Sequence, residues 1–153
     1  PSISAKLADE MLRGLKFDNR TRERVVTLVE YHDVQIPNRE RSIRKWLSRL
    51  GPETFFQFLE VKRADGMGQA YELVKNRLTE LEDMKAKAEE IVDQGQCFSL
   101  KDLAVNGRDV IAAGVAPGPE VGRVLNGLLE QVISGEVPNE QKALLNLICR
   151  EWL

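Results

Sequence analysis

Residues 106–125 have the sequence NGRDVIAAGVAPGPEVGRVL. This pattern predicts two short helices joined by a glycine- and proline-rich turn, which leaves the amino end of the second helix uncovered. Free N–H groups and the helix dipole at such an end favour a bound phosphate. Three glycines would let a ligand approach the backbone closely, namely Gly114, Gly118 and Gly122. Arg108 and Arg123 can add positive charge, but a tight helix–turn–helix needs the same glycines merely to pack, so both roles are open.

Apolar residues recur at helical spacing on both sides of this motif. The longest run has apolar side chains at steps of three and four, at Val74, Leu78, Leu81, Met84, Ala88 and Ile91. Such spacing gives one continuous apolar stripe on a helix. No segment shows the sustained period of two that a strand requires. We therefore predict an all-α fold without a sheet, with two helical lobes joined by a long helix. The expected parts are residues 1–68, the connecting helix 69–96, and a small domain at 97–153.

The composition is that of a folded, soluble protein. The chain has 153 residues, of which 42% are hydrophobic and 30% are charged, and its formal net charge is −2. No apolar run approaches the roughly 18 residues of a membrane-spanning helix, so we expect a cytoplasmic protein without a membrane partner. An overall acidic chain is not typical of nucleic-acid binding proteins, but a local basic surface is compatible with it.

A basic cluster lies in residues 39–49, which read RERSIRKWLSR. On a helix, Arg41, Arg44 and Lys45 occupy neighbouring positions. One interpretation is contact with the phosphates of a nucleic acid, which positions the ligand without reading its sequence. The alternative is a solvated helix face over a buried Trp46.

Motifs for catalysis are missing from the sequence. It has no phosphate loop with its lysine, no Cys-x-x-Cys pair and no G-x-S-x-G turn. His32 is the only histidine, and with Asp33 and Asp65 it is a weak candidate for a metal site. Because an HD-type hydrolase holds its metal with several histidines and aspartates, we expect neither a metal site nor catalytic residues here.

Two parts of the sequence resemble a known family. Residues 99–130 and the following GEVPNE at 135–140 are similar to the C-terminal region of bacterial CCA-adding tRNA nucleotidyltransferases, in the poly(A) polymerase-like family. Residues 11–33 and the stretch KRADGMGQ at 62–69 resemble the later half of the HD-like helical region of many members. The similarity covers about residues 7–145, and its C-terminal part is the more specific.

The resemblance implies the helical body and tail of an enzyme that adds nucleotides to the 3′ end of tRNA. In that family an N-terminal head binds Mg²⁺, CTP and ATP, and nothing in this chain matches it, so the chain alone is expected to be inactive and without a cofactor. The helical parts of the family grip the elbow and acceptor stem of tRNA by shape and backbone. Matching positions predict an RNA-facing turn made by Asn106, Gly107, Arg108, Gly114, Pro117, Gly118, Gly122 and Arg123.

Two other functions are open at this point. A fragment of an HD-type metal-dependent phosphohydrolase would need histidines upstream of residue 1. A freestanding helical adaptor would bind another protein through the apolar stripe at 74–91. Self-association is compatible with each of these hypotheses.

Overall fold

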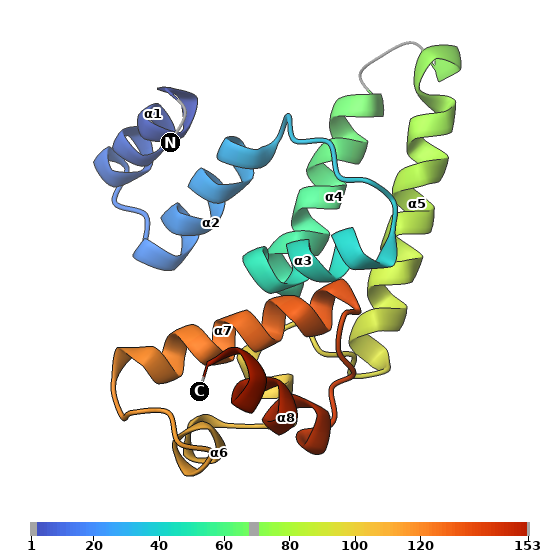
Figure 1. The fold of residues 1–153 in the computed structure, drawn as a ribbon. Coiled ribbons are helices and arrows are strands. Elements are labelled where there is room, and N and C mark those ends of the chain that lie inside the picture. The colour runs from blue at the N-terminus through green and yellow to red at the C-terminus, as the bar shows by residue number, and fades with distance from the viewer. Residues whose placement is uncertain (1–2, 68–70, 153) are drawn as a thin grey trace. The chain divides into compact units, whose positions relative to one another are not determined.

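The computed structural model describes residues 3–67 and 71–152, with only the backbone for residues 71–74. Within these ranges the chain forms eight α-helices, one short 3₁₀-helix and no strand, which confirms the all-α prediction (Figure 1). The elements are α1 (Ile3–Gly14), α2 (Asn19–Tyr31), α3 (Glu40–Leu50), α4 (Pro52–Met67), α5 (Tyr71–Asp93), η1 (Leu100–Asp102), α6 (Gly107–Ala112), α7 (Pro119–Ser134) and α8 (Gln141–Glu151).

The chain forms two compact units, residues 1–38 with 50–87, and residues 39–49 with 88–153. α3, apart from its last residue, therefore belongs with the carboxyl-terminal helices, and α5 begins in one unit and ends in the other. The predicted three-part division did not group residues 39–49 in this way. Its limits, including residues 69 and 70, which lie outside the described residues, stay a prediction.

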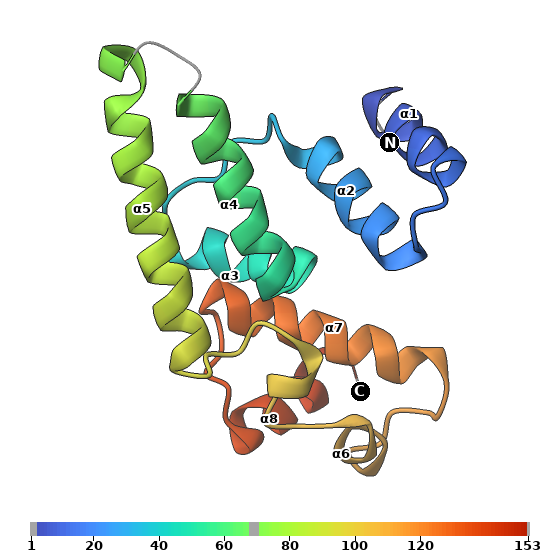
Figure 2. The ribbon, with the colours of Figure 1, turned by 180° about the vertical axis from the view of Figure 1, so that it is seen from behind.

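The first unit is built on α2, which contacts both α1 and α4 (Figures 1 and 2). Asp18 caps α2, because its carboxylate accepts a hydrogen bond of 3.0 Å from the backbone N–H of Thr21. Lys62 is almost fully buried on α4, and its Nζ donates to the His32 carbonyl oxygen at 2.9 Å. Burial, and then the nearby charge of Arg77, lower the pKa of Lys62. This lysine therefore ties α4 to the carboxyl end of α2.

The apolar stripe of α5 is buried within the chain. The exposed fractions are 8% for Leu81, 4% for Met84, 0% for Ala88 and 1% for Ile91. Val74, also assigned to this stripe, lies outside the described side chains. Because the chain itself covers these residues, they offer no surface to a protein partner, and the adaptor hypothesis loses the feature on which it was based.

The apolar spacing of α1 has the opposite outcome. Its four-residue stripe is exposed, by 87% at Ile3, 56% at Leu7, 60% at Met11 and 68% at Leu15. The buried residue of α1 is Ala5, on a different side of the helix. The spacing thus predicts that a helix forms, but not which of its sides is buried.

The core of the second unit is formed mainly by α7 and α8. Its fully or nearly fully buried side chains include Val105, Val110, Val124, Leu128, Leu144 and Ile148. Asn139 links the loops at the edge of this core, since its Oδ1 accepts from the Ala104 N–H at 2.8 Å and its Nδ2 donates to the Asp102 carbonyl at 2.7 Å. These contacts fix the loops around α6 and α7, where the predicted interface lies.

The two cysteines differ in reactivity. Cys97 is 6% exposed, and burial, assisted by the charge of Asp102, raises its pKa to about 11, whereas Cys149 is exposed. At pH 8 only about a thousandth of the Cys97 thiol is ionised. We expect a disulfide reagent such as DTNB to titrate one thiol rapidly in the folded chain and the second only after denaturation. Cys149→Ser should remove the rapid phase, and two rapid thiols in the wild type would contradict this arrangement.

Candidate nucleic-acid interface

Asn106 starts α6 and is committed to that structural role. Its Oδ1 accepts from the backbone N–H of Arg108 at 2.8 Å, and Asp109 Oδ2 accepts from the Asn106 N–H at 2.8 Å. These reciprocal bonds form a capping box. Gly107 is also explained by packing, because a Cβ there would lie 3.4 Å from Val121 Cγ1 on α7. At these two positions the structural interpretation accounts for the residue type.

The turn between α6 and α7 exposes the amino end of α7. Gly114 and Gly118 have φ angles of 120° and 135°, which favour glycine, and Pro117 lies exposed between them. Gly118 precedes the helix, and no side chain caps that end. Arg108 is exposed and has no ion pair among the residues that the structure describes. Arg123 is 74% exposed, with its Nη1 2.9 Å from Glu120 Oε2.

Gly122 separates the packing interpretation from the binding one. It is exposed within the first turns of α7, and a Cβ built there meets no atom within 4 Å. Packing therefore does not require glycine at this position. Gly122→Ala should raise the free energy of unfolding by about 0.5–1 kcal/mol, since alanine is the better helix former. If RNA approaches the backbone here, the same substitution should weaken RNA binding.

Chemical denaturation and a binding titration on the same Gly122→Ala preparation measure the two effects. Gly107→Ala is the matched control, because there the added methyl meets a neighbour and should not stabilise the chain. A stabilised Gly122→Ala chain with unchanged RNA binding would remove Gly122 from the interface.

The structure divides the predicted basic cluster on α3. Arg41 and Lys45 are exposed and line a groove, whereas the Arg44 side chain is only 21% exposed. Arg44 Nε is buried and has no hydrogen-bond partner among the described residues. Arg44 is therefore poorly placed for a phosphate, but Arg49 joins Arg41 and Lys45 along the groove. The four-residue step from 41 to 45 to 49 is the signal in the sequence that identifies it.

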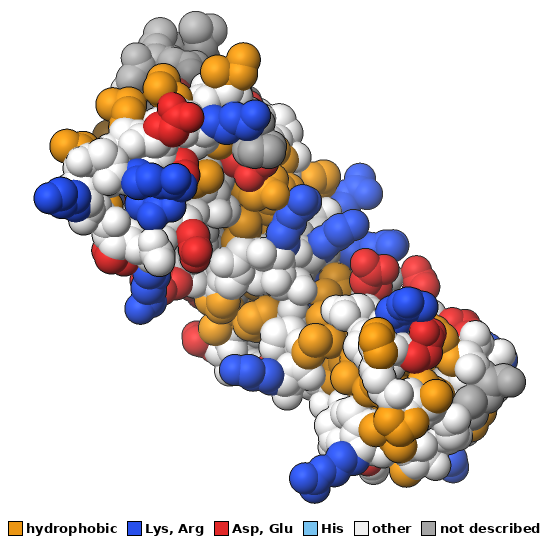
Figure 3. Space-filling view, turned by 90° about the vertical axis from the view of Figure 1, so that its left-hand side faces the viewer, with side chains coloured by type: hydrophobic (Ala, Val, Ile, Leu, Met, Phe, Trp, Pro, Cys, Tyr) orange, Lys and Arg blue, Asp and Glu red, His pale blue; other side chains and the backbone are white. Residues whose placement is uncertain are grey.

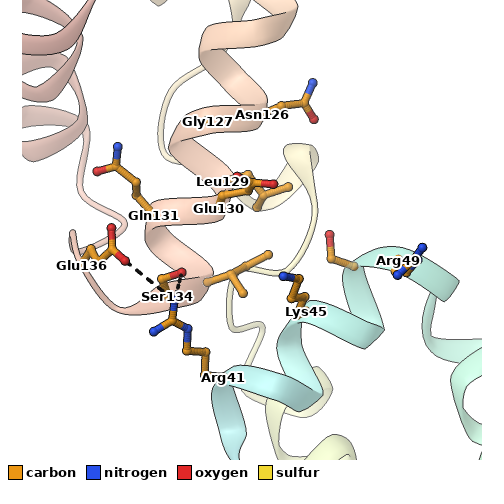
Figure 4. Close-up of a pocket in the computed structure, with 12 residues that line it drawn as sticks. Arg41, Lys45, Arg49, Asn126, Gly127, Leu129, Glu130, Gln131, Ser134 and Glu136 are labelled. Atoms are coloured by element: carbon orange, nitrogen blue, oxygen red, sulfur yellow. Dashed lines mark hydrogen bonds and ion pairs between the residues drawn. The ribbon is translucent and has the colours of Figure 1, made fainter. Parts of the chain in front are cut away.

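The groove lies within the second unit, between α3 and α7, and has a volume of about 670 Å³ (Figure 4). Its lining residues are Arg41, Lys45, Ser48, Arg49, Asn126, Gly127, Leu129, Glu130, Gln131, Ile133, Ser134 and Glu136. Arg41 extends across it, and its Nη2 donates to Ser134 Oγ at 2.9 Å. On the face shown in Figure 3, lysine and arginine side chains lie among acidic and hydrophobic ones, so a basic surface has to be local.

The two predicted basic regions meet opposite halves of α7. The turn precedes Pro119, and Ser134 at the other end bonds Arg41. Sixteen helical residues span about 24 Å. Arg123, Gly127, Glu130 and Ser134 follow one another at steps of three and four, so they share one side of the helix. The fold thus places the turn and the groove along one face of α7.

The weak metal candidates do not come together as a binding site. His32 Nδ1 donates to the Val29 carbonyl at 2.7 Å, and its Nε2 is 3.1 Å from Asp33 Oδ2. Asp65 lies 3.8 Å from Arg77 Nη2. In residues 3–67 and 71–152 no three His, Cys, Asp or Glu side chains are grouped so that they could hold a metal ion. The described residues therefore do not fit a metal cofactor.

No helix in the described part of the chain combines the length and the apolar character needed to cross a membrane.

Comparisons with known proteins give consistent matches. The family model described as tRNA nucleotidyltransferase domain 2 (putative) matches residues 2–148. A CCA-adding enzyme of Levilactobacillus brevis is 45% identical over 62 residues, covering 39% of this chain and 16% of that protein. One of Lacticaseibacillus paracasei is 51% identical over 47 residues, or 31% of this chain and 12% of the relative. An A-adding tRNA nucleotidyltransferase of Deinococcus radiodurans is 29% identical over 153 residues, covering 92% of this chain and 32% of that protein.

The chain thus spans a third or less of the length of these relatives. No solved structure matches it.

Proposed function

This chain belongs to the tRNA nucleotidyltransferase domain 2 family, and on that premise we propose that it is the helical, tRNA-binding part of an enzyme that adds nucleotides to the 3′ end of tRNA. The observation that carries the proposal is the family match over residues 2–148, nearly the whole chain. Named relatives that add CCA or A support the same reaction class. The protein would act in the cytoplasm, on tRNA as its substrate.

The chemistry is assigned to a part of the enzyme outside this chain. Nucleotidyl transfer from CTP or ATP requires Mg²⁺ held by carboxylates, and the described residues provide no such group. We therefore expect this chain alone to add no nucleotide. Its own contribution is to hold the tRNA so that the 3′ end reaches an active site on another domain.

Recognition by this chain would use the tRNA backbone rather than its base sequence. Double-helical RNA is recognised mostly by shape, through phosphates and 2′-hydroxyls. The exposed Arg108 and Arg123 beside the uncapped end of α7 suit phosphates, and bare backbone at Gly118 and Gly122 permits close approach. We assign this turn to the elbow and acceptor-stem region of the tRNA, in line with the resemblance of residues 99–130.

An immunoblot of source-cell lysate with an antibody to this chain tests the assignment of chemistry. A band far above 17.3 kDa would agree with a catalytic part in the same polypeptide. A band at that mass would contradict it. In parallel, the purified chain is incubated with a tRNA transcript lacking CCA and labelled CTP or ATP. We expect no incorporation, and label at the tRNA 3′ end would refute the view that this chain is inactive alone.

A further inference from the structure

The two walls of the α3–α7 groove carry different chemistry. On α3, Arg41, Lys45 and Arg49 stand at intervals of four residues, which places one cation about every 6 Å along the helix. The α7 wall carries the amide of Asn126 and the carboxylate of Glu130. One wall is thus cationic throughout, whereas the other offers hydrogen-bonding groups and negative charge.

Such a pair of walls suits a polyanion whose two edges differ. A sugar–phosphate strand has phosphates on one edge and ribose hydroxyls towards the other. Its phosphates would be attracted by the α3 cations and repelled by Glu130 on the opposite wall. The 2′-hydroxyl both donates and accepts a hydrogen bond, so it can donate to the Glu130 carboxylate and bond the free Oδ1 or Nδ2 of a reoriented Asn126 amide.

Arg41 is held across the groove by contacts that a phosphate can replace. Besides donating to Ser134, its Nη2 lies 3.8 Å from Glu136 Oε1, and the two charged side chains are 64% and 59% exposed. An exposed ion pair at this distance contributes little. A phosphate accepts paired hydrogen bonds from a guanidinium and therefore competes well for it. Lys45 forms no ion pair in the part of the chain that the structure describes.

We propose that the α3–α7 groove seats one sugar–phosphate strand of RNA, with phosphates against Arg41, Lys45 and Arg49 and ribose edges against α7, and that Glu136 competes with this strand for Arg41. The inference rests on the proposed tRNA-binding function and extends it from the α6–α7 turn to the far half of the same face of α7. Because DNA lacks the 2′-hydroxyl, the groove should prefer RNA to DNA of the same sequence.

The test measures binding of the full chain to a tRNA transcript lacking CCA and to a DNA strand of the same sequence, over a range of salt concentrations. Lys45→Ala with Arg49→Ala should weaken RNA binding and lower the slope of log affinity against log salt by about two. Both side chains are exposed, so thermal unfolding should confirm that the variant folds.

Glu136→Gln provides a gain of affinity that a damaged fold would not produce. Removing the competitor for Arg41 should tighten RNA binding about two- to fivefold. Glu89→Gln is the matched control, since it removes one negative charge from an exposed position of α5 outside the groove. It should have a smaller effect.

Asn126→Ala with Glu130→Ala tests the orientation of the strand. Loss of the Glu130 charge favours RNA and DNA alike, so the ratio of the two affinities isolates the ribose contacts. We expect this ratio to fall. An unchanged ratio would overturn the orientation.

The outcomes separate this inference from the proposed function. If the wild type binds RNA and the Lys45→Ala, Arg49→Ala chain binds with the same affinity and salt slope, the groove is not the seat of the strand and the function stands. If Glu136→Gln and Glu89→Gln act equally, the competition for Arg41 is refuted. If the wild-type chain does not bind RNA at any salt concentration, both the groove and the RNA-binding role of this chain are overturned.

Discussion

Replacing Arg108 and Arg123 together with alanine is expected to weaken binding of a tRNA transcript and to lower the slope of log affinity against log salt by about two. Each arginine that contacts a phosphate releases a counterion from the RNA, so its loss removes roughly one unit of that slope. Arg108 is exposed on α6, and Arg123 is 74% exposed near the uncapped end of α7. Binding titrations at several salt concentrations measure both quantities.

The first unit offers a matched control for this double variant. Arg63 is paired with Glu60 three residues before it, as Arg123 is with Glu120, and Arg13 is exposed like Arg108. Arg13→Ala with Arg63→Ala removes the same total charge away from α6 and α7. It should change the slope much less. Equal effects of the two double variants would mean that net charge, rather than the turn, determines binding.

Leu128→Ala is expected to lower the free energy of unfolding by about 2–5 kcal/mol. Leu128 is completely buried in the core formed mainly by α7 and α8, and the truncated side chain would leave a cavity among well-packed neighbours. Urea denaturation followed by circular dichroism measures the loss. Because Leu128 lies on the helix that carries both the turn and the groove, RNA binding should also fail at lower urea concentrations.

Leu100→Ala is the control for that substitution. Leu100 lies in η1 and is 43% exposed, so the same change of side chain should alter the unfolding free energy by less than about 0.5 kcal/mol. If Leu128→Ala were as mild as Leu100→Ala, the packing of α7 against α8 described above would be wrong.

Local signals in the sequence predict much of the fold. The glycine and proline residues around 114–119 mark the end of α6 and the start of α7, because few other residues adopt the φ angles found at Gly114 and Gly118. Steps of three and four likewise identify α5, and four of its stripe residues are buried. Helices of this kind depend on short-range spacing, which a single sequence contains.

Contacts between distant segments are not predictable in this way. Arg41 and Ser134 are 93 residues apart, and nothing in the local pattern indicates that α3 lies beside α7. For the same reason the α7 wall of the groove, with Asn126 and Glu130, was absent from the predicted site. Arg44 and Lys45 are adjacent and both basic, but only the packing around α3 decides that one is largely buried and the other exposed.

Backbone footprinting of a bound tRNA transcript with hydroxyl radicals tests the central claim most directly. With the unmodified chain, we expect protection of the sugar–phosphate backbone at the elbow and along the acceptor stem, and none in the anticodon arm. Protection at the elbow should fade in the Arg108→Ala, Arg123→Ala chain. A tRNA that stays equally cleaved at every position, or that is protected only in the anticodon arm, would contradict the assignment of this chain as the part that grips the tRNA elbow and acceptor stem.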